Sequence, residues 1–273
     1  MPVSKPTPLV FAKARDGAPL GYRILSGSGV GRIALTHSLA MDHRFWDVLT
    51  PHLTAAGEVL VWDCRGHGAS AKSPGPYTCE QFADDLADVL DAAGWDRCVV
   101  AGASMGGCVT LAFAAAHPER VMGVGLIDTT AWYGVKAPEQ WEERAQKAVV
   151  SGLAVLVDFQ KSRWFSLAFI DAHPEIVDSA VQAFLDNDLD AYVETCRMLG
   201  RFDKRDALAG FAFPTRIVVG SDDKATPPAM AKAMQIAIPG ATLKIIDGGA
   251  HLTPIECPEL VAGDLTLLMT NRA

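Results

Sequence analysis

A serine lies between glycines in the stretch GASMGG, residues 102–107, directly after an apolar run over 98–101. The pattern G-x-S-x-G, with a strand before it and a helix after it, is typical of a very sharp strand-to-helix turn. In such a turn the residues two before and two after the serine come close together, so both must be small, as Gly102 and Gly106 are. The strained turn points the serine Oγ outward, beside the positive end of the helix. Ser104 is therefore a candidate nucleophile, and a glycine-rich packing turn is the alternative.

Predicted strands and helices alternate along most of the chain. Apolar runs predict the strands, and helical spacing of apolar residues predicts the helices. The first two strands flank Asp16-Gly17 and are expected to form an antiparallel hairpin. The alternation predicts an α/β fold with a mostly parallel sheet and helices on both faces. The predicted strands are 9–14, 20–25, 33–36, 58–62, 97–101, 121–127, 215–220 and 242–246, and the predicted helices are 45–56, 78–93, 105–116, 227–237 and 258–269.

The segment 131–210 differs from the rest of the chain. It carries helical patterns rich in tryptophan and acidic residues, and no clear strand. We therefore expect an α/β core made of residues 1–130 and 211–273, interrupted by a helical cap, or lid, at 131–210. The cap is expected to lie over the carboxyl edge of the sheet, where open α/β sheets bind their ligands.

A nucleophilic serine needs a base, and the base needs an orienting acid. Among the seven histidines His251 is the best candidate for the base, because it lies between a predicted strand and the last helix, at the same sheet edge as Ser104. Asp128, Asp222 and Asp223 each follow a predicted strand at that edge. All three give the chain order Ser…Asp…His. Position alone therefore leaves the acid open among them.

An oxyanion formed by attack on a carbonyl needs two backbone N–H donors. One donor is expected from the residue after the nucleophile, Met105. The other is expected from the loop after an earlier strand, here THSLAMD, with Leu39 as the candidate. A bulky side chain is acceptable at either position because only the amide is used.

Composition and charge exclude several other classes. The chain has 273 residues, a net charge of −8 and no basic patch, so small molecules are expected as ligands and nucleic acid is not. The N-terminus lacks an apolar signal region and no apolar run could span a bilayer, so we expect a cytoplasmic protein without a membrane partner. Six cysteines without a CxxC pair are expected to be reduced thiols and not metal ligands. The sequence leaves open whether the protein forms a homo-oligomer.

Three loops show a resemblance to a known superfamily. The stretch WDCRGHGAS resembles the strand–loop D-x-R-G-x-G-x-S of the α/β-hydrolase superfamily, GSDDKATPP resembles its acid loop, and GGAHLTPIECP resembles its histidine loop. The resemblance covers nearly the whole chain and implies an α/β-hydrolase fold. In the superfamily's acid loop the triad aspartate stands two residues before the A-T-P step. The resemblance therefore implies Asp223 as the acid, with Ser104 and His251.

Further stretches are similar to the 3-oxoadipate enol-lactonases: ASMGG, HPERV, IDTTA, RWF, DKATPP, AIPGA and AHLTPIECP. This similarity implies a serine hydrolase of small esters or lactones that needs no metal and no organic cofactor, with hydrolysis of an enol-lactone as the expected reaction. The chain departs from the family in two places. THSLA stands where the family has N-S-L-G, and TTAWYG brings Trp132 and Tyr133 to a place where smaller residues are usual.

The resemblance also suggests where the substrate is held. An enol-lactone of this family carries a carboxylate, which favours a cation in the pocket. Arg144, Arg163 and Arg197 of the cap are the candidates, and the residues alone do not choose among them. Trp132 and Tyr133 are expected near the pocket roof, and Arg163 and Trp164 belong to the family-like stretch RWF.

Other functions stay open from the sequence. A general carboxylesterase or a carbon–carbon bond hydrolase could use the same three residues, although the latter usually carries an H-G-G-x loop where this chain has His37-Ser38-Leu39. A perhydrolase or cofactor-free haloperoxidase side activity also fits the same triad. Outside enzymes, a receptor that kept the fold for ligand binding is the alternative.

Overall fold

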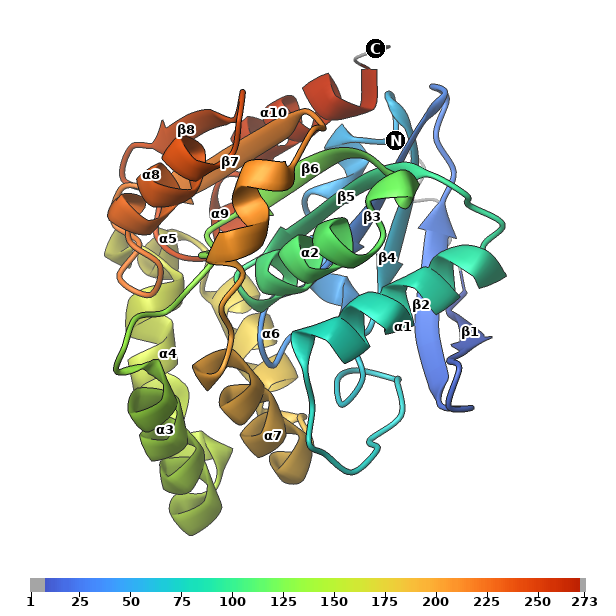
Figure 1. Cartoon of the computed structure of the whole chain (residues 1–273). Helices are drawn as coiled ribbons and strands as arrows, with labels where there is room; N and C mark the ends of the chain where they lie inside the picture. Colours follow the sequence, from blue (N-terminus) through green and yellow to red (C-terminus); the bar gives the residue numbers. More distant parts are fainter. Residues whose placement is uncertain (1–7, 271–273) are drawn as a thin grey trace.

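The computed structural model describes residues 8–270 and contains one sheet of eight strands (Figure 1). The strand order is β1-β2-β4-β3-β5-β6-β7-β8. The β1–β2 and β2–β4 pairs are antiparallel, and every later pair is parallel, which confirms the predicted mostly parallel α/β sheet. The strands are β1 (Val10–Lys13), β2 (Pro19–Leu25), β3 (Gly31–Thr36), β4 (Gly57–Trp62), β5 (Cys98–Ala103), β6 (Val121–Ile127), β7 (Thr215–Gly220) and β8 (Thr242–Ile246).

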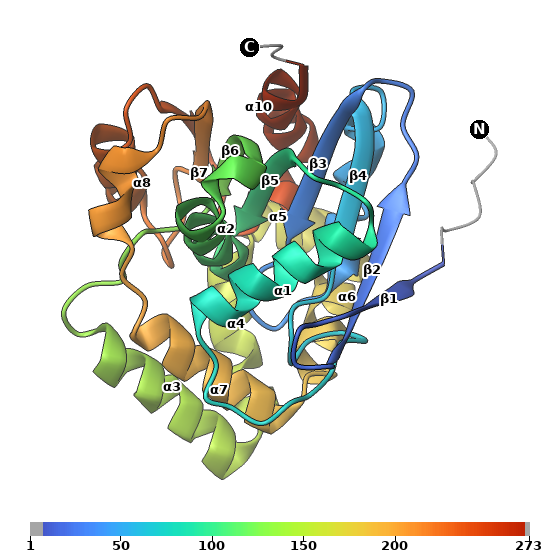
Figure 2. The ribbon, with the colours of Figure 1, turned by 45° about the vertical axis from the view of Figure 1, so that its right-hand side comes forward.

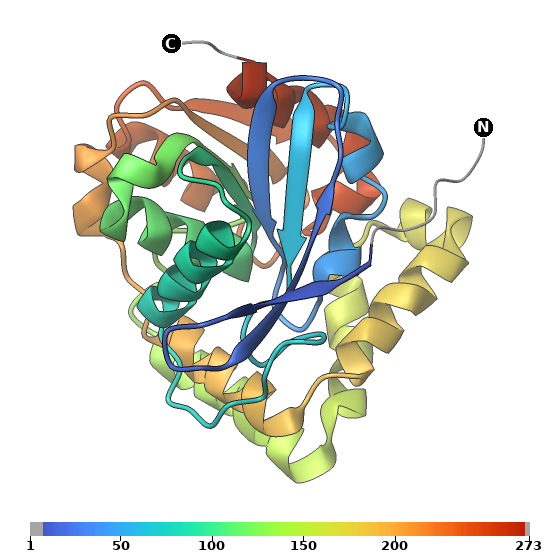
Figure 3. The same ribbon diagram turned by 90° about the vertical axis from the view of Figure 1, so that its right-hand side faces the viewer.

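Helices cover both faces of this sheet (Figure 3). Helices α1 (Cys79–Ala92) and α2 (Met105–Ala116) lie on one face, and α10 (Pro258–Thr270) packs against β3, β5, β6 and β7 on the other. Helix α8 (Pro228–Ala237) packs on the last two strands. The central strands are buried on both sides, so they are continuous apolar runs, as parallel strands usually are.

One predicted helix is wrong. Residues 45–56 form no α-helix but two short 3₁₀ helices, η1 (His43–Trp46) and η2 (Thr50–His52). Pro51 accounts for the interruption, because it has no N–H to donate to a carbonyl of the preceding turn and is accepted only at the start of the second short helix. The apolar side chains that suggested a helix, such as Trp46 and Leu49, are fully buried. Their spacing therefore predicted which side chains are buried, although not the type of helix.

Between β6 and β7 the chain is helical, as its composition predicted. Helices α3 and α7 lie side by side, away from the sheet, while α1 crosses the front of the core (Figure 2). At the base of the segment a single antiparallel bridge joins Trp132 to Asp203. The helices are α3 (Ala137–Ser151), η4 (Leu153–Leu156), α4 (Val157–Trp164), α5 (Leu167–Ala172), α6 (Pro174–Leu185), α7 (Leu189–Gly200) and η5 (Arg205–Gly210).

The six cysteines are all unpaired, and five of them are buried. Burial raises the pKa of Cys98 to about 12 and that of Cys108 to about 11, so both are protonated, unreactive thiols at neutral pH. Within residues 8–270, none of the helices has the length and apolar character needed to cross a bilayer.

Candidate active site

Ser104 lies at the turn from β5 into α2, in a left-handed backbone conformation with φ 53° and ψ −115°. Its N–H donates to the carbonyl of Ile127 (2.9 Å) and its carbonyl accepts from the Thr129 hydroxyl (2.7 Å), so the turn is fastened to the neighbouring strand. A Cβ on Gly102 would collide with the Gly106 carbonyl, and one on Gly106 would collide with the Thr36 carbonyl. The two glycines are therefore required by close backbone contact, as the sequence pattern predicted.

His251 lies in the loop between β8 and the short helix α9 (Thr253–Glu256), and its ring reaches Ser104. The distance from His251 Nε2 to Ser104 Oγ is 2.9 Å. On the other side of the ring, Nδ1 lies 2.8 Å from Asp223 Oδ2. An ionised carboxylate can only accept, so Nδ1 carries the proton and Nε2 presents its lone pair to the serine hydroxyl. All three side chains are nearly buried.

Asp223 is held by the first turn after β7. Its Oδ1 accepts from the backbone N–H groups of Ala225 (2.7 Å) and Thr226 (2.9 Å), and its Oδ2 also accepts from the Thr226 hydroxyl (2.8 Å). Burial opposes ionisation of this carboxyl, but the His251 imidazole and the Thr226 donors outweigh it and lower the pKa of Asp223 to about 2. The neighbouring Asp222 is exposed and only accepts from the Ser221 hydroxyl.

Asp128, the third acid left open by the sequence, is fully buried at the end of β6. Its Oδ1 accepts from the Gly220 N–H (3.1 Å), and its Oδ2 accepts from the N–H (2.9 Å) and hydroxyl (2.6 Å) of Thr253. Burial and the nearby Asp223 carboxylate raise the pKa of Asp128. The hydrogen bonds of Asp128 thus fasten the end of β7 to the helix after His251, whereas the His251 imidazole bonds to Asp223.

The two expected oxyanion donors belong to two segments next to the serine. Met105 is the first residue of α2, where helix N–H groups have no acceptor within the helix. Leu39 lines the cavity beside Ser104. His37 holds the Leu39 peptide: its Nδ1 donates to the Ser38 carbonyl (2.8 Å), and its Nε2 accepts from the Cys64 N–H (3.0 Å). Because the C=O and N–H of a trans peptide point in opposite directions, this contact turns the Leu39 N–H away from His37.

A cavity of about 700 Å³ opens above the serine, between the sheet edge and helices α3 and α4. Three of the expected substrate contacts, Tyr133, Arg163 and Trp164, line it. Trp132 does not line it, which corrects the sequence expectation. The ring of Trp132 lies 3.8 Å from the Arg205 guanidinium, which covers it, and its backbone is held in the bridge to Asp203.

The structure separates the three candidate arginines. Arg197 forms ion pairs with Glu142 (2.9 Å) and Glu194 (2.7 Å), and it is not among the cavity-lining residues. Arg144 and Arg163 line the cavity, and within residues 8–270 no acidic side chain pairs with either guanidinium.

Arg144 and Arg163 lie on the same aromatic ring. Their guanidinium carbons lie 4.9 Å and 4.5 Å from the centroid of Phe159. Burial and the charge of Arg144 lower the pKa of Arg163. Both cations line the cavity without an acidic partner and one of them is partly desolvated, so they favour the binding of an anion there.

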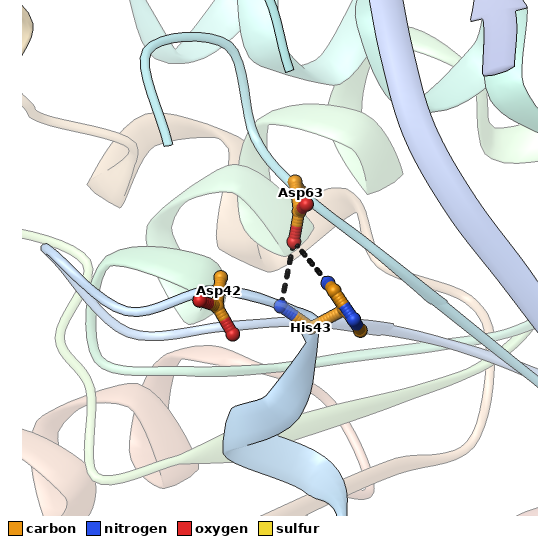
Figure 4. Close-up of side chains that lie close together, drawn as sticks. All are labelled: Asp42, His43 and Asp63. Atoms are coloured by element: carbon orange, nitrogen blue, oxygen red, sulfur yellow. Dashed lines mark hydrogen bonds and ion pairs between the residues drawn. The ribbon is translucent and has the colours of Figure 1, made fainter. Parts of the chain in front are cut away.

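One group of three potential metal ligands occurs within residues 8–270: Asp42, His43 and Asp63, whose ligand atoms lie within 4.8 Å of one another (Figure 4). Both carboxylates already accept hydrogen bonds from other groups. Asp63 Oδ1 accepts from His43 Nδ1 (2.8 Å) and its N–H (2.6 Å), and Oδ2 accepts from Ala69 (2.8 Å). Asp42 pairs with Arg44 (2.6 Å). Although burial opposes ionisation, the His43 contact keeps the pKa of Asp63 below its ordinary value. These contacts join the loops after β3 and β4.

Several residues around the site were missed by the sequence analysis. Phe159 and the buried amide Gln160 line the cavity, and Thr226 supports the acid. Glu256 and Asn187 hold loops that carry the candidate site residues, as described below. Glu256 and Asn187 have no sequence signal of their own, because each bonds to a backbone group of a segment distant in sequence.

Comparisons with known proteins place the chain in a family. It matches the family model of the alpha/beta hydrolase fold over residues 32–258. It is 30% identical over 245 residues to 3-oxoadipate enol-lactonase 1 of Acinetobacter baylyi, covering 90% of this chain and 91% of that protein. The crystal structure of the enol-lactonase from Burkholderia xenovorans LB400 matches with a TM-score of 0.91 and 30% identity, over 96% of this chain and 100% of that one.

A more distant relative is a putative carbamate hydrolase, RutD, of Azorhizobium caulinodans, which is 27% identical over 88% of this chain and 91% of its own length. These relatives are all named for the cleavage of ester-like bonds. The chain therefore belongs to the alpha/beta hydrolase family, is similar within it to the 3-oxoadipate enol-lactonases, and is a hydrolase that acts on ester or lactone bonds.

Proposed function

We propose that this chain hydrolyses a small lactone that carries a carboxylate, of the 3-oxoadipate enol-lactone type, with Ser104 as nucleophile, His251 as base and Asp223 as orienting acid. One observation carries the proposal. Ser104, at the end of the hydrogen-bonded series Ser104–His251–Asp223, lines the same cavity as Arg144 and Arg163, two arginines without an acidic partner within residues 8–270. The similarity to the enol-lactonases supports the same substrate class.

The geometry suits acyl transfer through the serine. His251 Nε2 takes the proton of Ser104 Oγ while the oxygen attacks the lactone carbonyl. The amides of Met105 and Leu39 donate to the developing oxyanion. Asp223 stabilises the imidazolium that forms. When the tetrahedral intermediate collapses, the ring C–O bond breaks and His251 returns the proton to the leaving enol, which relaxes to the ketone. Water, deprotonated by His251, then releases the acyl group from the serine.

The arginine pair supports an acidic substrate over a neutral one. A carboxylate that binds to one or both guanidinium groups gains charge-assisted hydrogen bonds. Each such bond to a charged group is worth about 1.5–3 kcal/mol, or roughly 10- to 100-fold in binding. The other ionised side chains that line the cavity are Lys147, Lys224 and Glu143, so its lining is cationic in a chain whose net charge is −8.

Replacing Arg144 or Arg163 with glutamine should therefore lower kcat/KM for the carboxylate-bearing lactone by roughly 10- to 100-fold. Turnover of a neutral lactone of the same ring size should change little, because its ring and carbonyl meet the same triad. Steady-state kinetics with the two substrates measure the difference. Arg197→Gln is the matched control, since that arginine is paired outside the cavity. Equal losses for both substrates, or a loss in Arg197→Gln as large as in the other two, would contradict the carboxylate role.

A general carboxylesterase is the second candidate, favoured by the size of the cavity. A volume of about 700 Å³ is in the range of sites for drug-sized ligands and exceeds the needs of a small lactone. A substrate panel separates the two functions. The proposal expects the highest kcat/KM for the carboxylate-bearing enol-lactone, above saturated lactones and above aryl esters of increasing acyl length. A preference for long neutral aryl esters would favour the esterase.

Two further expectations belong to this proposal. We take residues 131–210 as a cap that closes the cavity, since α3 and α4 supply much of its wall. We also place the protein in a reducing compartment, the cytoplasm, which its six unpaired cysteines support.

A further inference from the structure

The loop that carries His251 is bonded to helix α4 and the residues after it. The N–H of His251 donates to the carbonyl of Arg163 (3.3 Å), and the next N–H, of Leu252, donates to the carbonyl of Trp164 (3.0 Å). Both acceptors lie in the last turn of α4, where helix carbonyls have no partner within the helix. The proposed base thus shares two backbone hydrogen bonds with the helical segment.

Glu256 adds a third connection between the same parts. Its Oε2 accepts from the N–H of Ala250 (2.9 Å), the residue before His251, and its Oε1 accepts from the N–H of Ser166 (3.2 Å). Ser166 is the N-cap residue of helix α5, directly before Leu167. One carboxylate therefore ties the histidine loop to the start of α5, about 90 residues earlier in the chain. This half-buried side chain has no place in the proposed chemistry.

A similar connection holds the loop of the proposed oxyanion donor. Asn187 lies between α6 and α7, and its Nδ2 donates to the carbonyl of Ala40 (2.7 Å) as well as to Ala183 (2.7 Å) and Phe184 (3.2 Å). Ala40 follows Leu39 and has a left-handed φ of 57°, which a residue other than glycine adopts at a cost. The Asn187 bond helps to hold this strained residue.

We propose that the helical segment 137–200 positions the catalytic loops as well as covering the cavity, with Glu256 as the positioning residue for His251 and Asn187 as the positioning residue for the Leu39 amide. The proposal rests on the proposed function, because it gives these two loops their roles. It predicts that each side chain affects the rate of the chemical step and has little effect on substrate affinity. A misplacement of about 1 Å in a catalytic group can cost roughly 100-fold.

Glu256→Gln tests the first half. The amide keeps the shape of the side chain but can accept from only one of the two N–H groups. We expect kcat to fall by about 10- to 100-fold with KM close to wild type. The midpoint of the acid limb of the pH–rate profile should also move to lower pH, because a looser contact between His251 Nδ1 and Asp223 stabilises the imidazolium less. Glu259→Gln, an exposed glutamate three residues later, is the matched control.

Ser166 gives a second test that leaves Glu256 in place. Ser166→Pro removes only the N–H that Glu256 accepts and the hydroxyl that caps α5, and the native φ of −67° already suits proline. Phe165 before it is extended, as a residue before proline prefers. Ser166→Ala removes the hydroxyl alone. A lower kcat in Ser166→Pro than in Ser166→Ala, at unchanged KM, supports the connection even if Glu256→Gln fails to fold.

Asn187→Ala tests the second half, with the exposed Gln182→Ala as its control. Here kcat should fall by about tenfold or more while the pH–rate midpoint stays in place, since only the oxyanion donor is disturbed. Wild-type kcat in Glu256→Gln, Ser166→Pro and Asn187→Ala would overturn the inference. If the three variants have wild-type kcat and Ser104→Ala is inactive in the same assay, the inference is wrong and the proposed function stands. If Ser104→Ala is active, the proposed function itself is wrong.

Discussion

Replacing Ser104 with alanine should lower kcat by a factor on the order of 10⁵, as in other hydrolases whose nucleophile, base and acid act as a unit. The fold should survive, because alanine is smaller than serine and is no more strained at a φ of 53°. Within residues 8–270 the Ser104 hydroxyl makes one hydrogen bond, to His251 Nε2, so its removal leaves the bonds of the fold in place. Steady-state kinetics and a thermal melt of the purified variant measure both effects.

The cavity offers a matched control for this variant. Ser38 also lines the cavity, but only its backbone carbonyl takes part in the loop that carries Leu39. Ser38→Ala should therefore stay close to wild type in kcat. A Ser104→Ala protein that keeps more than a few per cent of wild-type kcat, or a Ser38→Ala protein that loses as much, would show that the nucleophile is wrongly assigned.

Asp223→Asn should lower kcat by a factor on the order of 10⁴, because the amide can donate to His251 Nδ1 and so favours the wrong tautomer of the ring. Asp222→Asn should be nearly wild type, since that side chain is exposed and bonds only to Ser221. The two adjacent aspartates thus control for each other. Kinetics under one set of conditions, with circular dichroism to check folding, decide between them.

Asp128→Asn is the third member of this series. Its carboxylate accepts from Gly220 and twice from Thr253, so the variant should lose stability, by about 1–3 kcal/mol for a buried donor left without a partner. Its turnover should remain far above that of Asp223→Asn. If Asp128→Asn is the inactive variant and Asp223→Asn still turns over, the acid lies at the end of β6 and the acid loop has been misread.

The low pKa of Asp223 also makes a prediction about stability. Its value of about 2 in the folded protein lies below the ordinary 3.8, so the folded state binds fewer protons than the unfolded state between these values. The ionised Asp223 carboxylate therefore adds to the free energy of unfolding above about pH 4, and this added stability is lost as the pH falls toward 2. Asp223→Asn should therefore lose stability less steeply than wild type over that acidic range.

The sequence predicted the core of the fold because its signals are local. The turn at Ser104 needs small residues at fixed offsets, and the structure shows both glycines against backbone atoms. The strands β6, β7 and β8 and the helix α2 have the predicted limits, since proline, glycine or aspartate stands at or near their ends. The prediction of an α-helix around Pro51 was wrong because buried residues there have helical spacing without forming an α-helix.

The candidate site was only partly predictable. Position after a predicted strand left the acid open among Asp128, Asp222 and Asp223, and the resemblance of the acid loop implied Asp223. In the structure the Asp223 carboxylate lies against the imidazole. Trp132 and Tyr133 are neighbours in sequence, yet one is covered by Arg205 and the other lines the cavity. Such differences depend on side-chain direction in a loop, which has no periodicity to reveal it.

The most direct test of the account is to identify the atom that forms the covalent intermediate. The intact protein is treated with a fluorophosphonate, digested, and the modified peptide is located by mass spectrometry. The account predicts one adduct per chain, on Ser104, formed rapidly in wild type, slowed strongly in Asp223→Asn and absent in Ser104→Ala. An adduct on another residue, or no adduct on a protein that hydrolyses lactones or esters under the same conditions, would contradict it.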